Sequence, residues 1–82
     1  MKTFEIYTTK SCPYCVEAKK LIKNKGHTYI EYNVPTDATK EHIQKKLEKL
    51  GVSVTVRTVP QIFVGNEYIG GHDELVMYFN NR

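Results

Sequence analysis

The sequence predicts a single α/β domain over residues 1–82, with a four-stranded mixed β-sheet that carries helices on both faces. Three observations predict this class. First, several short runs are rich in β-branched and aromatic residues. Second, these runs alternate with segments whose apolar residues recur at helical spacing. Third, only a Gly-Asn pair separates the last two runs. The resulting order is β-α-β-α-β-β-α, in which the first two strands should be parallel and the last two should form an antiparallel hairpin.

The first half of the chain is expected to form a βαβ unit. A strand covers Thr3 to Thr8, a helix runs from Pro13 to Gly26, and a second strand covers His27 to Val34. Proline suits the first position of a helix because its missing N–H has no helical partner there. Glycine commonly ends a helix because it readily adopts a left-handed conformation.

The second helix is expected to begin at a cap provided by Thr36 or Asp37 and to end at Gly51. Its apolar stripe consists of Ile43, Leu47 and Leu50. The β-branched segment 52–56 that follows reads either as a strand or as an extended lead-in to the next element.

The last third is expected to form a hairpin and a helix. Strands over 61–64 and 67–69 flank a Gly65-Asn66 turn of type II′. Asp73 is expected to cap the final helix, whose apolar positions are Leu75, Tyr78 and Phe79.

Charge and composition exclude several classes of protein. The net charge is +3, and much of the positive charge falls at positions 40, 45, 46 and 49, beside Glu41 and Glu48, as is typical of a solvated helix face. Basic residues do not alternate with aromatic ones as in a nucleic-acid platform, and we find no signal peptide and no membrane-spanning stretch. Two cysteines without a disulfide framework fit a reducing compartment, so we expect a cytoplasmic protein. We also expect a monomer that binds neither nucleic acid nor membranes.

Those two cysteines, Cys12 and Cys15, lie three positions apart at the start of the first predicted helix. This spacing places both sulfurs on one side of the helix, where they can close a disulfide or open into a dithiol. The N–H groups at the helix N-terminus stabilise a thiolate at the first sulfur. The pattern therefore predicts a redox site with one nucleophilic and one resolving thiol. Zinc is the main alternative chemistry, but His27 and His42 fall on separate elements, and we expect no metal.

Three motifs together resemble the glutaredoxins, small members of the thioredoxin superfamily. Cys12–Cys15 reads Cys-Pro-Tyr-Cys, Thr58–Pro60 reads Thr-Val-Pro, and Gly70–Asp73 matches the Gly-Gly segment of that family. The motifs follow the family's order and spacing, and the resemblance covers the whole chain. The compact length is similar to that of bacterial or phage-type members. The resemblance implies a thioredoxin-like fold and a cis peptide bond before Pro60.

The resemblance also implies a function. The protein would be a glutathione-disulfide oxidoreductase in electron transport and cell redox homeostasis, with Cys12 as nucleophile and Cys15 as resolving thiol. Glutathione would be the reducing co-substrate, no cofactor would be bound, and ribonucleotide reductase is one implied protein substrate. Either Asp73 or Glu74 would meet the glutathione ammonium. The implied glutathione-binding residues are Lys10, Tyr14, Arg57, Thr58, Val59, Pro60, Gly71, His72 and Asp73.

Two alternatives stay open. One is a glutaredoxin-like electron carrier that a flavoprotein reductase reduces directly. The other is a cysteine-based module that binds a metal ion or an iron–sulfur cluster.

Overall fold

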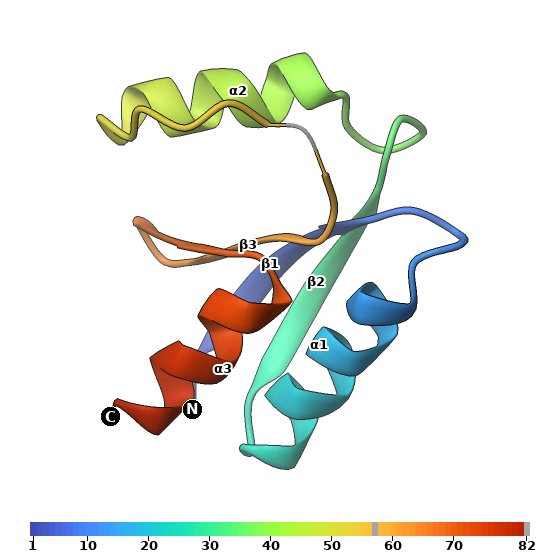
Figure 1. Ribbon diagram of the computed structural model, residues 1–82, viewed down its shortest axis with the longest axis vertical. Coiled ribbons are helices and arrows are strands. Elements are labelled where there is room, and N and C mark those ends of the chain that lie inside the picture. The colour runs from blue at the N-terminus through green and yellow to red at the C-terminus, as the bar shows by residue number, and fades with distance from the viewer. Residues whose placement is uncertain (57, 82) are drawn as a thin grey trace.

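The computed structural model describes residues 1–56 and 58–81 and has the predicted order of elements (Figure 1). The bounds are β1 (Thr3–Thr8), α1 (Pro13–Asn24), β2 (Thr28–Asn33), α2 (Lys40–Lys49), β3 (Gln61–Val64), β4 (Glu67–Gly70) and α3 (His72–Asn80). Among the described residues, no helix combines the length and apolar character that crossing a membrane requires.

The four strands form one mixed sheet in the order β2-β1-β3-β4. β1 and β2 are parallel, as a βαβ unit requires, whereas β3 is antiparallel to both β1 and β4. The β3–β4 turn has Gly65 at φ 59° and no positive φ at Asn66, in agreement with type II′. The carboxyl end of β1 leads directly to the cysteines, and open α/β sheets commonly bind ligands at such ends.

Helices cover both faces of the sheet: α1 and α3 lie on one face and α2 lies on the other (Figure 1). Because successive strand side chains point to opposite faces, each face has its own core. The core under α1 and α3 consists of Phe4, Ile6, Ala18, Ile22, Ile62, Val64 and Leu75. The core under α2 consists of Tyr7, Ile43, Leu47, Val56 and Phe63.

The predicted cap of α2 is wrong. The hydroxyl of Thr39 caps the helix by accepting a hydrogen bond from the His42 N–H at 3.1 Å. Asp37 is engaged elsewhere, since its carboxylate accepts from the Asn33 N–H at 2.9 Å and its own N–H donates to the Asn33 carbonyl at 2.7 Å. Asp37 therefore closes the turn after β2, and neither it nor Thr36 begins the helix.

The predicted cap of α3 is also wrong. Gly71 occupies the N-cap position, and Asp73 lies in the first turn. Glu74 accepts a hydrogen bond from the Gly71 N–H at 2.8 Å, which is one half of a capping box, because glycine has no side chain to supply the other half.

The ambiguous segment 52–56 is not a strand. The side-chain amide of Gln44 on α2 donates to the Val54 carbonyl at 2.7 Å and accepts from the Val56 N–H at 2.9 Å. These two bonds replace the backbone partner that a strand would have, so the segment stays extended along α2.

Candidate active site

Cys12 is the N-cap residue of α1. Its backbone is extended (φ −128°, ψ 95°), and its Sγ accepts a hydrogen bond from the Cys15 N–H at 3.1 Å. Pro13 follows at the first helical position, where no N–H is needed. The sulfur thus stands where serine or aspartate oxygens usually stand, facing unpaired N–H groups at the positive end of the helix dipole. The same donors stabilise a thiolate once the sulfur is reduced.

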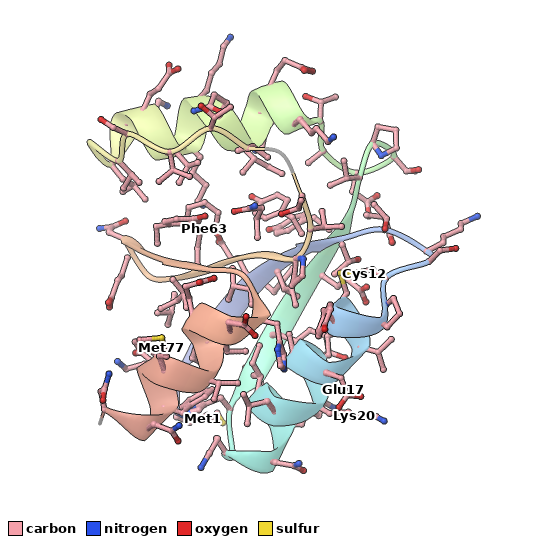
Figure 2. All side chains as sticks on the ribbon, in the orientation of Figure 1. Met1, Cys12, Glu17, Lys20, Phe63 and Met77 are labelled. Carbon is pink, nitrogen blue, oxygen red and sulfur yellow. A yellow bond between two sulfur atoms is a disulfide. The ribbon has the colours of Figure 1, made fainter. Side chains whose placement is uncertain are left out.

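Cys12 and Cys15 form a disulfide, with their Cα atoms 5.2 Å apart. The two sulfurs differ in access: Cys12 is half-buried, whereas Cys15 is only 1% exposed. Figure 2 shows Cys12 at the start of α1, where the chain leaves the sheet. A substrate can therefore reach the Cys12 sulfur, while Cys15 is placed for attack from inside the protein.

The Cys12 sulfur lies beside the segment that precedes β3. Its Sγ is 3.7 Å from the Val59 carbonyl oxygen, to which a reduced thiol can donate a hydrogen bond and a disulfide sulfur cannot. The Val59-Pro60 peptide bond is cis, in agreement with the expectation for Pro60. The Val34-Pro35 bond is also cis, which the sequence did not predict.

A groove of about 220 Å³ is built by three separate parts of the chain. The segment before β3 forms one wall, the N-terminal turn of α3 forms the other, and the first turn of α1 contributes an aromatic ring. The Tyr14 ring lies 5.4 Å from the His72 ring, so the two side chains meet across the groove. The lining residues are Tyr14, Thr58, Val59, Pro60, Gly71, His72, Asp73 and Glu74.

The two walls approach each other closely at the glycine pair. A Cβ on Gly71 would lie 3.6 Å from the Pro60 carbonyl oxygen and 3.3 Å from the Glu74 carboxylate. Gly70 has φ +122°, and a Cβ there would come within 2.8 Å of the Glu74 side chain. Gly70 therefore requires glycine for its backbone conformation, whereas a side chain at Gly71 would need the Glu74 carboxylate to move slightly.

Lys10, another predicted ligand residue, does not line the groove. Lys10 is exposed in the loop before Cys12, and Arg57 falls outside the described residues. Gln61 is 6% exposed and hydrogen-bonded to Thr58 and Tyr68, so it is a core residue and not a surface partner for a ligand. Strand alternation was the available signal, because Gln61 shares a face with Phe63.

A polar network links α1 to the sheet next to the cysteines. The buried hydroxyl of Thr8, at the end of β1, donates to the Glu31 carboxylate at 2.7 Å. Lys19 on α1 contacts the same carboxylate oxygen at 3.0 Å. The Thr8 hydrogen bond, followed by that from Lys19, lowers the pKa of Glu31 below its ordinary value of 4.5. These bonds connect β1, β2 and α1 near the point where the chain turns toward Cys12.

A metal site requires several ligating side chains that lie close together. Within residues 1–56 and 58–81, no three His, Cys, Asp or Glu side chains lie together in a way that could hold a metal ion.

Comparison with known proteins agrees with this geometry. The family model described as Glutaredoxin matches residues 4–69. Glutaredoxin 1 of Rickettsia prowazekii is 43% identical over 75 residues, which cover 92% of this chain and 75% of the relative. The solution structure of reduced Escherichia coli glutaredoxin is similar, with a TM-score of 0.77, 32% identity, and coverage of 98% of this chain and 95% of that one. A buckwheat glutaredoxin–glutathione complex is similar with a TM-score of 0.72, 28% identity, and coverage of 95% and 68%.

Proposed function

This chain belongs to the glutaredoxin family and is a thiol-disulfide oxidoreductase, and we propose that glutathione is its reductant. Its substrates under this proposal are protein disulfides and glutathionylated thiols. The observation that carries the proposal is the groove beside Cys12, which joins the nucleophilic sulfur to the N-terminus of a helix.

The chemistry of the groove suits a tripeptide with two carboxylates and one ammonium. The N–H groups of His72 and Asp73 open α3 and are suited to hold a carboxylate. The Asp73 carboxylate, 89% exposed, is suited to the ammonium. The backbone of Val59 can pair with the extended ligand, as in strand addition. The similarity to a buckwheat glutaredoxin whose structure contains glutathione supports this proposal.

Five further residues have proposed supporting roles. The exposed Tyr14 ring covers the ligand from the α1 side, and Pro60 and Gly71 let the two walls lie close together. The positive charge of Lys10 favours the thiolate and a ligand carboxylate. Arg57 is kept as a proposed carboxylate partner on the basis of sequence alone.

The first chemical step is attack by the Cys12 thiolate on one sulfur of the substrate disulfide. A bond forms between Cys12 Sγ and that sulfur, and the other substrate sulfur leaves as a thiolate and takes up a proton from water. With a protein disulfide, Cys15 then loses its proton, attacks Cys12 Sγ and releases the second substrate thiol. This leaves the Cys12–Cys15 disulfide seen in the structure.

Two glutathione molecules return the protein to its reduced form. The first glutathione thiolate attacks Cys12 Sγ and releases Cys15 as a thiol. The second attacks the glutathione sulfur of that mixed disulfide, which releases oxidised glutathione and the Cys12 thiolate. Glutathione reductase and NADPH would then reduce the oxidised glutathione. We keep ribonucleotide reductase as a proposed protein substrate and a cytoplasmic monomer as the proposed working form.

A coupled assay tests this proposal. Purified protein is mixed with NADPH, glutathione, glutathione reductase and the mixed disulfide of glutathione and 2-mercaptoethanol, and NADPH oxidation is followed. We expect turnover that depends on both glutathione and the protein. A parallel reaction contains the purified protein, NADPH and thioredoxin reductase, with a protein disulfide as substrate and without glutathione or glutathione reductase. Turnover only in that second reaction would show an electron carrier that a flavoprotein reductase reduces directly, against the proposal.

A further inference from the structure

A buried glutamine connects the β3–β4 hairpin to one wall of the groove. Gln61 is the first residue of β3 and is 6% exposed. Its Nε2 donates a hydrogen bond to the Thr58 carbonyl oxygen at 2.8 Å, and its Oε1 accepts one from the Tyr68 hydroxyl at 2.6 Å. A continuous path of hydrogen bonds therefore runs from β4 to the groove.

The direction of each bond in this path is determined by chemistry. A backbone carbonyl only accepts hydrogen bonds, so the amide NH₂ of Gln61 must face Thr58. The amide oxygen then faces Tyr68, whose hydroxyl must donate. Burial, with a smaller contribution from Glu74, raises the pKa of Tyr68, so this phenol keeps the proton that it donates. Loss of the Tyr68 hydroxyl would leave the Gln61 amide oxygen without this partner.

The Thr58 carbonyl matters because it belongs to the same planar peptide unit as the Val59 N–H. A hydrogen bond that holds the carbonyl oxygen therefore also fixes the direction of that N–H. Val59 lines the groove, and no described residue accepts a hydrogen bond from its N–H. The donor is thus available to a ligand, and the bond at the carbonyl polarises the peptide and strengthens it as a donor.

An amide at position 61 is costly unless both of its bonds are made. Gln61 pairs with Tyr7 across the sheet and shares a face with Phe63, both of which belong to the core under α2. An apolar side chain would pack at this position with no need of partners, whereas a buried amide without hydrogen bonds is destabilising. The Gln61 amide is therefore stable at this position only while it keeps its hydrogen bonds to Thr58 and Tyr68.

We propose that Tyr68 is a positioning residue for glutathione recognition: through Gln61 it orients the Thr58–Val59 peptide so that the Val59 N–H meets the bound tripeptide. Tyr68 itself is not part of the groove lining. This inference rests on the proposed function, since the ligand that Val59 meets is glutathione.

The test compares Tyr68→Phe with a matched loss of a hydroxyl at Tyr32. Tyr32 packs against the same core, with its ring stacked 4.9 Å from that of Tyr7, and no described residue hydrogen-bonds to its hydroxyl. In the coupled assay, Tyr68→Phe should raise KM for the mixed disulfide by about 3- to 10-fold, the effect of one weakened hydrogen bond. Its kcat and the rate at which iodoacetamide alkylates Cys12 should change by less than about 2-fold, which is the scatter expected when a substitution does not act on the measured step. Tyr32→Phe should match the wild type throughout.

Two further measurements separate positioning from a merely structural role. Gln61→Leu should raise KM at least as much as Tyr68→Phe, and the double variant should behave like Gln61→Leu alone, because the hydroxyl acts only through the amide. In ¹⁵N–¹H spectra without ligand, the Val59 amide signal should move in Tyr68→Phe and stay in place in Tyr32→Phe.

Three results would overturn the inference. These are an unchanged KM in Tyr68→Phe, an equal rise in KM in Tyr32→Phe, or an unmoved Val59 signal. If Gln61→Leu fails to fold, the Tyr68→Phe and Tyr32→Phe pair still decides the matter. A wild-type protein without glutathione-dependent turnover would refute the proposed function, and the inference with it, before any variant is compared.

Discussion

The Glu74 carboxylate accepts a hydrogen bond from the Gly71 N–H at 2.8 Å, and this bond closes the first turn of α3, which forms one wall of the groove. One of the two acids at this end of the helix is therefore already engaged. The other, Asp73, is 89% exposed, and among the described residues its carboxylate has a polar contact with the His72 imidazole alone, at 3.4 Å. This difference favours Asp73 as the partner of a ligand ammonium.

Asp73→Ala should accordingly weaken recognition of the glutathionyl group. An exposed ion pair contributes at most about 1 kcal/mol, so we expect KM for a glutathionylated substrate to rise by roughly 2- to 5-fold. The rate of Cys12 alkylation by iodoacetamide should stay near that of the wild type. Asp73→Asn, which keeps the shape and loses the charge, should behave like Asp73→Ala. Unchanged kinetics in both variants would move the ammonium partner to Glu74 or elsewhere.

Reduced Cys12 should ionise more readily than a free thiol. The Cys15 N–H points at its sulfur from 3.1 Å, and the helix dipole adds to the stabilisation of the anion. The measurement is the rate of iodoacetamide alkylation against pH in Cys15→Ser, which leaves one thiol. We expect a midpoint well below that of free cysteine, about 8.5. A midpoint at or above ~8 would contradict the role given to the helix N-terminus.

Glu31 should make stability depend on pH in the acid range. Because hydrogen bonds from Thr8 and Lys19 lower its pKa in the folded state, the stabilisation is present above 4.5 and is lost as the pH falls through the lower folded-state value. Glu31→Gln should lower the free energy of unfolding at pH 7 by about 1 kcal/mol, which lowers Tm by roughly 4–8 °C in a domain of this size.

The same experiment has an internal control. The Tm difference between wild type and Glu31→Gln should shrink as the pH falls from 4.5 through the lower folded-state pKa of Glu31, because below that pKa both proteins carry a neutral side chain at this position. Glu48→Gln removes the same charge from an exposed position on α2 and should have little effect at either pH. A Tm difference that stays constant from pH 7 to pH 3 would show that the carboxylate does not act through its charge.

The fold was predictable because its signals are local. Apolar spacing defined the helices, the Gly65-Asn66 pair defined the hairpin, and the short βαβ unit required parallel first strands. The position of Cys12 at the start of a helix followed from Pro13 alone.

The predictions that failed depend on competition between partners. Asp37 has the chemistry of a helix cap, but the turn after β2 uses its carboxylate first. Strand alternation indicates that Gln61 is buried, but its hydrogen bond to Tyr68 could not be predicted, because only the hairpin register brings the two side chains together. The three segments that line the groove could be named in advance from their motifs, whereas the hydrogen bonds that hold them could not.

The central claim is that Cys12 is the nucleophile and Cys15 only resolves. The accessible sulfur is that of Cys12, and Cys15 is 1% exposed behind it. The most direct test measures Cys12→Ser and Cys15→Ser on two substrates, a glutathionylated thiol and a protein disulfide, with thermal melts as the control for folding.

The two variants should fail differently. Cys12→Ser should lose both activities, because a serine hydroxyl provides no comparable anion at neutral pH. Cys15→Ser should still remove glutathione from the glutathionylated thiol, because a second glutathione resolves that intermediate, but it should lose turnover on the protein disulfide and trap its partner as a mixed disulfide. Equal loss of both activities in both variants, with a matched fall in Tm, would contradict this account and favour a structural or metal-binding role for the pair.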